Sequence, residues 1–303
     1  MMVLDGALAT ELERRGADLN DPLWSAKCLI ERPDLIREVH VDYFRAGADV
    51  ATTATYQATF EGFARRGIER QAAAQSMCHA VGIAVAARDE FWGVESNRTG
   101  RLRPLIAASV GPYGAMLGDG SEYRGNYALD DAALADFHGP RLRVLAHAGA
   151  DLLACETIPC LREALVLARA LQEFPDVYAW ISFSCRDGGL TSEGEDIGKC
   201  VAELRDYPQI AAVGVNCTAP QYITPLLQIM RANTDKPLMV YPNSGECYQA
   251  SLKRWRGAGG TKQLGAQARH WYAEGARLIG GCCRTGPMDI RGVKQCLQSD
   301  LSG

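Results

Sequence analysis

Short apolar runs alternate with longer amphipathic segments along the whole chain. The runs are rich in Val, Ile, Leu and Ala and end at polar or glycine residues, a pattern typical of buried strands. Between them, apolar residues recur three and four positions apart, as in 33–46, where Pro33 suits a first helical turn and Gly47 a C-terminal cap. Strands are expected at 2–5, 49–56, 104–110, 151–156, 178–184, 210–217, 237–243 and 277–283.

The alternation of these runs with helices predicts a closed barrel. Around Gly47, Gly149 and Gly275, a helix ends at a glycine and a strand begins two residues later. Apolar strands joined by amphipathic helices form a parallel sheet covered by helices, and eight such units favour a (β/α)8 TIM barrel over a doubly wound sheet. Barrels of roughly 250 residues fold as one unit. We therefore expect a single α/β domain over residues 1–303.

The composition narrows the class of protein. With 47% hydrophobic and 22% charged residues, the chain can bury a sizeable core. A net charge of -4 and scattered arginines argue against a nucleic-acid partner. The sequence contains neither a leader-like start nor a run of about 18 apolar residues, so we expect no membrane contact and a cytoplasmic location. Most of the 11 dispersed cysteines are then expected to be reduced, small, buried side chains.

The C-terminal ends of barrel strands carry the reactive groups, so the ends of the predicted strands are candidate site positions. Nearly every predicted strand ends in polar or nucleophilic residues, which a purely structural barrel does not require. The residues at these ends are Asp5, Gly6, Tyr56, Ser109, Glu156, Cys185, Asn216, Cys217, Asn243, Cys282 and Cys283.

Two adjacent cysteines, Cys282 and Cys283, follow a flexible Gly280-Gly281 pair, so both thiols can reach one metal ion. Cys217, at another strand end on the same rim, supplies a third thiol. Three thiolates and a vacant position are typical of a catalytic Zn²⁺ site. The alternatives are two buried apolar side chains, or a zinc-storage or thiol-redox protein that uses the adjacent pair.

The charge of such a centre restricts its chemistry. Three thiolates around Zn²⁺ leave a formal charge of -1, which makes a poor Lewis acid for amide hydrolysis. Coordination lowers the pKa of a substrate thiol from about 8.5 and so favours its nucleophilic form. The matching electrophile is a methyl group on a positive sulfur or nitrogen, because an anionic site attracts a cation.

Several segments, taken in chain order, together resemble the motifs of one family. They are Asp5–Leu12, Thr55–Thr59, Ser109–Gly114, Leu152–Thr157, Asn216–Cys217, Tyr241–Glu246 and Gly280–Arg284. In these segments the chain resembles the zinc-dependent homocysteine S-methyltransferases, from Met2 to about Gln298. It is most similar to the bacterial and plant type that uses S-methylmethionine or S-adenosylmethionine.

The resemblance implies methyl transfer from a sulfonium donor to homocysteine, giving methionine. It implies that Cys217, Cys282 and Cys283 hold Zn²⁺ and that the homocysteine sulfur is the fourth ligand. Tyr56 would then lie beside the zinc and fill its open position when substrate is absent. The implied substrate-binding residues are Glu156 for the amino group, Asp5 and Gly6 with Trp24 or Ser25 for the amino-acid end, and the neighbouring Asn216 and Asn243.

Structural roles compete with these assignments. Glu156 could cap a helix or form a salt bridge, Asp5 could cap the next helix, and Trp24 could be a core residue. Tyr56 and Asn243 could be ordinary hydrogen-bonding residues of the rim. Betaine remains an alternative donor, although the chain lacks the carboxyl extension of oligomeric betaine-using relatives, so a monomer is expected.

Two further features depart from the family pattern or fall outside it. Cys185 and Cys247 stand where relatives generally lack cysteine, so either could crowd the zinc or oxidise with a ligand; a spectator role is the simpler expectation. The glycine-rich segment 111–129 carries Tyr113, Tyr123 and Tyr127. It is long for a loop after a strand, and it is either a lid or a surface loop.

Overall fold

Eight parallel strands form one sheet in the computed structural model, which describes residues 1–19, 25–249, 254–256 and 264–298. Their order is β1-β10-β7-β6-β5-β4-β3-β2, and a parallel bridge between Leu4 and Val50 joins the two ends of this order. The predicted (β/α)8 barrel is thereby confirmed. The strands are β1 (Met2–Val3), β2 (Val50–Thr52), β3 (Leu105–Val110), β4 (Leu152–Ile158), β5 (Ala179–Phe183), β6 (Ile210–Asn216), β7 (Leu238–Tyr241) and β10 (Ala276–Ile279).

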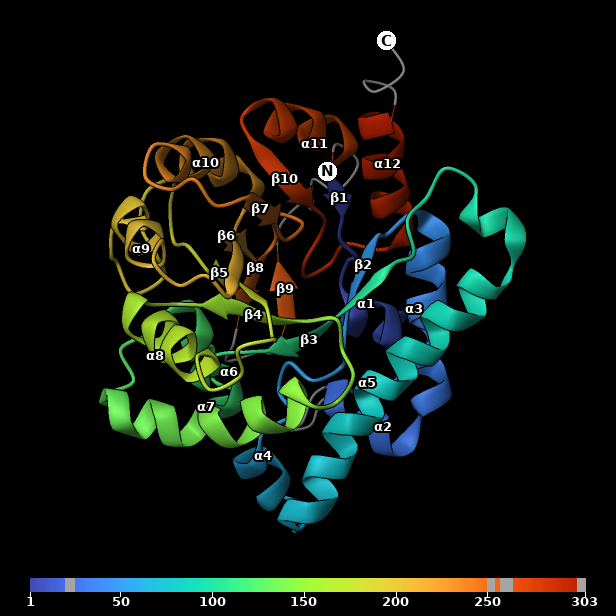
Figure 1. Cartoon of the computed structure of the whole chain (residues 1–303), viewed down its shortest axis with the longest axis horizontal. Coiled ribbons are helices and arrows are strands. Elements are labelled where there is room, and N and C mark those ends of the chain that lie inside the picture. The colour runs from blue at the N-terminus through green and yellow to red at the C-terminus, as the bar shows by residue number, and fades with distance from the viewer. Residues whose placement is uncertain (20–24, 250–253, 257–263, 299–303) are drawn as a thin grey trace.

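Helices surround these strands (Figure 1). The helix predicted in 33–46 begins with Pro33 in its first turn and ends at Gly47, whose φ of 114° is left-handed. Among the described residues, no helix is both long and apolar enough to cross a membrane. The α-helices are α1 (Leu8–Arg14), α2 (Ser25–Glu31), α3 (Pro33–Ala46), α4 (Phe60–Ala64), α5 (Arg70–Gly93), α6 (Tyr113–Leu117), α7 (Asp131–Ala146), α8 (Leu161–Leu171), α9 (Ile197–Glu203), α10 (Ile223–Arg231), α11 (Leu264–Ala273) and α12 (Pro287–Gln298); the short 3-10 turns are η1 (Glu95–Arg98), η2 (Ser121–Tyr123) and η3 (Pro220–Tyr222).

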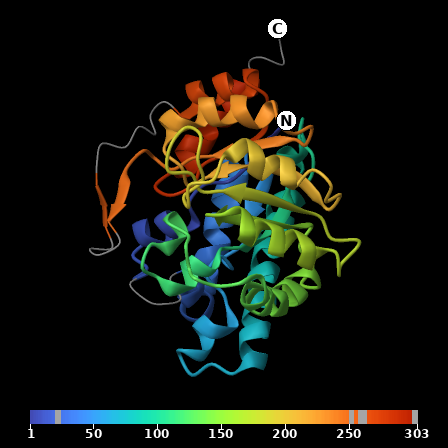
Figure 2. The ribbon, with the colours of Figure 1, turned by 90° about the vertical axis from the view of Figure 1, so that its left-hand side faces the viewer.

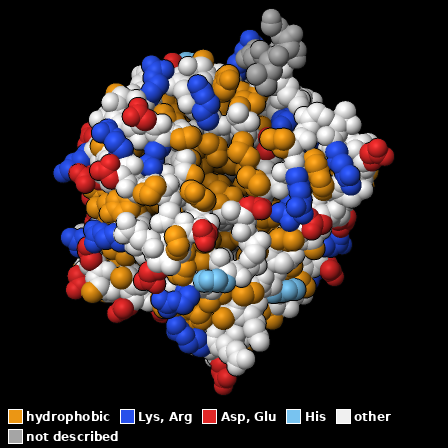
Figure 3. Space-filling model, viewed as in Figure 1, with side chains coloured by type: hydrophobic (Ala, Val, Ile, Leu, Met, Phe, Trp, Pro, Cys, Tyr) orange, Lys and Arg blue, Asp and Glu red, His pale blue; other side chains and the backbone are white. Residues whose placement is uncertain are grey.

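The barrel interior is filled by side chains rather than open. Trp180 and Met239 are buried there with smaller residues from the other strands. Partly buried Met2, Leu105 and Leu152, each the first residue of its strand, pack against this cluster. On the face shown in Figure 3, apolar side chains gather around a central hollow and charged side chains lie around them. The interior is thus a packed core of the kind expected for this fold.

Two of the repeated helix-to-strand joints contain an aspartate with the same role. Asp49 accepts a hydrogen bond from the backbone N–H of Val3 at 2.9 Å, and Asp151 accepts one from Ile106 at 2.7 Å. Each carboxylate also binds a cation, since Lys294 lies 3.0 Å from Asp49 and Arg88 lies 2.9 Å from Asp151. The aspartate therefore joins the start of its own strand to the preceding one and to a covering helix.

An antiparallel hairpin of β8 (Cys247–Gln249) and β9 (Arg254–Arg256) interrupts the βα pattern after β7. It projects from the body of the barrel in Figure 2. The apolar pattern does not predict it, because each strand has only 3 residues.

Candidate metal centre

The sulfur atoms of Cys217, Cys282 and Cys283 all lie within 4.8 Å of one another. The Sγ atoms of Cys217 and Cys283 lie 3.3 Å apart. Cys217 follows β6, and the adjacent pair follows β10, as the predicted strand ends require. The two neighbouring thiols favour the ionised form of Cys217, which holds its pKa well below the ordinary value.

The end of β7 lies between these two strands and fixes both cysteine backbones. Tyr241 accepts the N–H of Cys217 at 3.1 Å, and Pro242 accepts the N–H of Cys282 at 2.8 Å. Asn243 Nδ2 donates to the carbonyl of Cys217 at 3.2 Å. Cys217 has φ 47°, a left-handed conformation that a non-glycine residue adopts only when its surroundings hold it there. Asn243 therefore supports the backbone of Cys217.

The glycine pair before the adjacent cysteines is required by close packing. A Cβ on Gly280 would lie 2.6 Å from Leu4 Cβ, and one on Gly281 would lie 2.2 Å from Thr285 Oγ1. The N–H of Gly281 donates to the carbonyl of Asp5 at 3.0 Å, so β10 runs against the end of β1. Both glycines thus allow the cysteine turn to approach the first strand.

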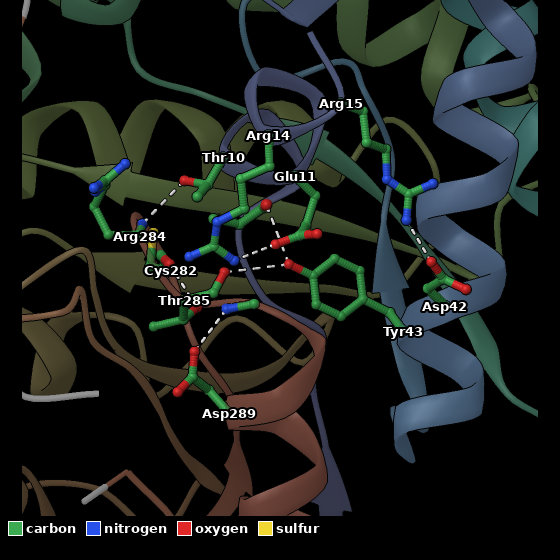
Figure 4. A network of polar contacts seen from close by, with 12 residues as sticks. Thr10, Glu11, Arg14, Arg15, Asp42, Tyr43, Cys282, Arg284, Thr285 and Asp289 are labelled. Atoms are coloured by element: carbon green, nitrogen blue, oxygen red, sulfur yellow. Dashed lines mark hydrogen bonds and ion pairs between the residues drawn. The ribbon is translucent and has the colours of Figure 1, made fainter. Parts of the chain in front are cut away.

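A network of hydrogen bonds holds the turn 282–285, which begins with the adjacent cysteines (Figure 4). Thr285 Oγ1 donates to the carbonyl of Cys282 at 2.7 Å, and Thr10 Oγ1 accepts the N–H of Arg284 at 3.1 Å. The Tyr43 hydroxyl donates to the carbonyls of Ala7 at 3.1 Å and Thr285 at 3.3 Å. Helices α1 and α3 therefore both support the turn that carries the adjacent cysteines.

Two buried carboxyl groups lie on the same rim. Glu156, on β4, accepts a hydrogen bond from Ser109 on β3, and burial raises its pKa to about 7. Asp5 accepts the N–H of Thr52 at 2.8 Å, and burial raises its pKa well above the usual range, an effect that the charge of Glu156 increases. Neither carboxyl group caps a helix or pairs with a basic residue in these contacts, so the structural alternatives for them find no support here.

Asn216, predicted as a substrate-binding residue, makes hydrogen bonds to strands β4 and β5. Its Oδ1 accepts the N–H of Thr157 at 2.7 Å and the hydroxyl of Ser182 at 2.8 Å. Its Nδ2 donates to Thr157 Oγ1 at 2.8 Å and lies 3.8 Å from Cys282 Sγ. The side chain has no exposed surface. Its contacts hold β4, β5 and β6 in register beneath the cysteines.

Three further predicted positions are Tyr56, Gly6 and Trp24 or Ser25. Burial raises the pKa of the Tyr56 hydroxyl, and the charges of Glu122, Cys217 and Glu156 raise it further. A Cβ on Gly6 would lie 2.9 Å from the Tyr43 hydroxyl, which gives this glycine a packing role. Ser25 is the first residue of α2, but its side chain, like all of Trp24, lies outside the described residues.

Segment 111–129 brings two residues to the cluster whose roles the sequence does not indicate. The Tyr123 hydroxyl lies 3.2 Å from Cys217 Sγ. Burial raises the pKa of its neighbour Glu122 to about 7, and the charge of Cys217 adds to this effect. The segment contains α6 and η2, and the glycines between them supply left-handed turns. Tyrosines in a long loop were the available signal, but they do not show which one reaches the thiols.

Cys185 lies outside the three-cysteine group found among the described residues. Its N–H donates to Thr218 Oγ1 at 3.0 Å, and burial raises the pKa of its thiol, as does the nearby Cys200. Cys247 begins β8, and its side chain lies outside the described part of the chain.

Curated relatives match the chain over nearly its whole length. The Bacillus subtilis homocysteine S-methyltransferase YbgG is 57% identical over 293 residues, covering 97% of this chain and 93% of that protein. The Escherichia coli homocysteine S-methyltransferase is 50% identical over 295 residues, with 97% and 94% covered. A profile of the family described as homocysteine S-methyltransferase matches residues 2–297.

Solved structures agree with these matches. The metallated form of the homocysteine methyltransferase MmuM from Escherichia coli superposes with a TM-score of 0.88 at 48% identity, covering 97% of this chain and 96% of that one. Its oxidised form superposes with a TM-score of 0.86 at the same identity, covering 97% and 95%. A match to a metallated relative and a three-cysteine cluster together indicate a metal site in this chain. The chain belongs to the homocysteine S-methyltransferase family and is a methyltransferase.

Proposed function

We propose that the protein transfers a methyl group from S-methylmethionine to the sulfur of homocysteine, with Zn²⁺ held by Cys217, Cys282 and Cys283. The observation that carries the proposal is the group of three thiol sulfurs within 4.8 Å of one another, on the same barrel rim as buried Glu156 and Asp5. S-adenosylmethionine and then betaine rank below S-methylmethionine as donors.

The donor set fits zinc. Soft sulfur ligands select Zn²⁺ over Mg²⁺ or Ca²⁺, and three protein ligands leave one position for substrate. Asn243 and Thr285 support the backbones of the ligands, as hydrogen-bonded neighbours of metal sites commonly do. When bound, Zn²⁺ lowers the pKa of a thiol that coordinates it, so that the thiolate is available at neutral pH.

The buried acids are suited to the polar end of homocysteine. Glu156 offers a carboxylate for the ammonium group, and Ser109 fixes the direction of that carboxylate. Asp5, held by Thr52, adds negative charge at the same end. Because an ammonium stabilises an ionised carboxyl, substrate binding lowers the raised pKa of Glu156. Both acids thus orient the amino acid so that its sulfur points to the cysteines.

The methyl transfer balances without a further reactant. The bond between the methyl carbon and the donor sulfonium breaks, and its electron pair stays on the donor sulfur, which becomes a neutral thioether. The homocysteine sulfur supplies the pair for the new carbon–sulfur bond, after its proton has been released. With S-methylmethionine, both products are methionine. The Tyr123 hydroxyl lies 3.2 Å from Cys217 Sγ, so this side chain limits the access of water to that sulfur.

Cys217→Ala tests the proposal, with Cys78→Ala as a control because Cys78 is an exposed cysteine outside the cluster. Bound zinc is measured by atomic emission, and methionine is measured after supplying homocysteine with S-methylmethionine, S-adenosylmethionine or betaine. We expect Cys217→Ala to lose zinc and methionine formation, while the control keeps both. Unchanged zinc content and activity in Cys217→Ala would contradict the ligand assignment.

A thiol-redox protein is the second candidate. The 3.3 Å separation of the Cys217 and Cys283 sulfurs favours it, because two reduced thiols at this distance need little movement to form a bond. It predicts a reversible disulfide and thiol exchange that do not depend on homocysteine. Retention of bound zinc during turnover, with methionine as the product, would exclude it as the main activity.

A further inference from the structure

A cavity of about 640 Å³ is lined by Tyr123, and none of the three cysteines is among its lining residues. Segment 111–129 contributes Tyr123, Arg124 and Tyr127 to its wall, and the segment after β5 contributes Arg186, Ser192 and Glu193. Both segments follow the C-terminal ends of their strands. The cavity therefore opens on the same rim of the barrel as the three thiols.

Hydrogen bonds between the two segments fix the shape of this cavity. Ser184 Oγ donates to the carbonyl of Glu122 at 2.9 Å, and the N–H of Asn126 donates to Glu193 Oε1 at 2.9 Å. Gly125 has φ 67°, and a Cβ there would lie 2.9 Å from Glu193 Cβ. The two walls thus meet at defined contacts that leave the space between them.

The wall carries charges of both signs next to aromatic rings. The guanidinium groups of Arg124 and Arg186 pair with Asp119 and Asp187 at 3.4 and 3.7 Å, which are long, exposed ion pairs. Such pairs are weak, and each guanidinium has five N–H donors, so both can bind a carboxylate. Glu193 offers an acceptor for an ammonium group. The faces of Tyr123 and Tyr127 attract a cation such as a sulfonium.

Tyr123 connects this cavity to the cysteines, because its side chain lines the cavity and its hydroxyl lies 3.2 Å from Cys217 Sγ. A ligand seated against Tyr123 is therefore separated from the cluster by one side chain. A group of that ligand can reach the cluster only when the Tyr123 side chain moves aside.

We propose that this cavity is the methyl-donor subsite and that it binds an amino-acid sulfonium by its carboxylate, its ammonium and its sulfonium. The inference rests on the proposed function and adds a location and a charge requirement for the donor. Arg186 and Arg124 bind the carboxylate, Glu193 binds the ammonium, and the two tyrosines face the sulfonium. Betaine and dimethylsulfoniopropionate each carry a cation and a carboxylate. Neither has a protonated amino group, so neither can bind Glu193 in the proposed way.

The test measures the KM for the methyl donor and the KM for homocysteine separately, by steady-state kinetics. Glu193→Gln keeps an oxygen for the Asn126 N–H and removes the charge, and Arg186→Ala removes the carboxylate partner. Glu173→Gln and Arg143→Ala are matched controls, because these two residues form an exposed ion pair on other segments. We expect the KM for S-methylmethionine to rise about tenfold in each cavity variant, with the KM for homocysteine unchanged.

Donor analogues provide the second arm. If dimethylsulfoniopropionate is accepted at all, Glu193→Gln should leave its KM unchanged, whereas Arg186→Ala should raise it. An unchanged KM for S-methylmethionine in both cavity variants of an active enzyme would overturn the subsite and leave the proposed function standing. A wild-type, zinc-loaded enzyme that forms no methionine from any donor would instead contradict the proposed function.

Discussion

Burial gives the acidic side chains of the rim properties that exposed carboxylates lack. Glu156 is 9% exposed and Asp5 is 4% exposed, and both carry raised pKa values because a buried charge loses its hydration. In the proposed complex, the ammonium group of homocysteine would supply the missing counter-charge. Ionising these carboxyl groups therefore costs free energy in the free protein, and a bound ammonium would offset that cost. Shifted pKa values of this kind are common at binding sites.

Homocysteine binding should depend on the ionisation of Glu156. Because its pKa is raised to about 7, the carboxyl is mostly protonated below that pH, and the KM for homocysteine should fall as pH rises through about 7. Glu156→Gln should flatten this dependence and raise the KM at pH 8 about 10- to 100-fold. Initial rates at saturating donor between pH 6 and 8 measure both effects.

Glu122→Gln is the control, since the pKa of Glu122 is also raised to about 7. It should retain the pH dependence of the KM. The assignment to Glu156 is wrong if the dependence survives in Glu156→Gln and disappears in Glu122→Gln.

For single residues, the sequence predicted the site residues at strand ends. It could not predict the residues that loops bring to the cysteine cluster. Cys217, Cys282 and Cys283 come together as expected, because parallel strand ends share a rim. Tyr123 reaches Cys217 across 94 positions of chain, and its approach depends on left-handed glycines in an irregular segment. Asn216 also lies at a strand end, and its side chain bonds to Thr157 and Ser182 of strands β4 and β5, so its role in substrate binding stays a prediction.

At the scale of elements, the turn after β10 is held from two directions. Gly280 packs against Leu4 and Asp5, which follow β1, and Gly281 packs against Thr285. Thr285 and Thr10 also form hydrogen bonds to the turn. A metal site needs its ligands placed before the metal arrives, and this packing limits how far the adjacent cysteines can move. The element is therefore expected to tolerate little extra volume.

Gly281→Ala should displace Thr285, because the added Cβ would lie 2.2 Å from its Oγ1. We expect a loss of about 1–3 kcal/mol in the free energy of unfolding, typical of overpacking, together with weaker zinc binding. Gly292→Ala in α12 is the matched control, since nothing lies within 4 Å of its added Cβ. Urea denaturation and competition with a zinc chelator measure the two effects. Equal stability and zinc affinity for both variants would contradict the packing argument.

The apolar pattern placed all eight barrel strands but missed the β8–β9 hairpin. A buried parallel strand is marked by a continuous apolar run, whereas this hairpin is short and lies off the barrel, so no run marks it. Strand ends were also expected later than they occur, at 56 rather than Thr52 for β2 and at 243 rather than Tyr241 for β7. After β2, residues 54–57 form a turn, so the apolar run continues beyond the last paired residue of the strand.

For the whole molecule, closure of the barrel depends on the start of the chain. β1 has 2 residues and lies between β10 and the bridge to β2. Asp49 strengthens this short strand, because it accepts the Val3 N–H and binds Lys294 from α12 and Arg101 from the segment before β3. One carboxylate thus connects the first strand, 46 positions before Asp49, with residues 52 and 245 positions after it.

Asp49→Ala should destabilise the whole barrel, because it leaves the Val3 N–H and two cations without their shared partner. We expect a loss of about 2–3 kcal/mol and a fall in Tm of about 4–8 °C. Asp49→Asn, which keeps an acceptor for Val3, should lose less. Asp151→Ala should also lose less, since Asp151 is 36% exposed and Asp49 only 16%. Calorimetry of the three variants measures the order of their Tm values. Equal Tm values would refute this role for Asp49.

The pairing of β1 with β10 has a consequence for how the protein is made. A ribosome synthesises the partner of the first strand almost last, and Cys283 follows directly after it. Until then, β1 and β7 present unpaired edges, which are the places where incomplete barrels associate wrongly. The last βα unit therefore closes the barrel and completes the three-thiol cluster in the same event. A chain released before that point would have neither a closed fold nor a place for the metal.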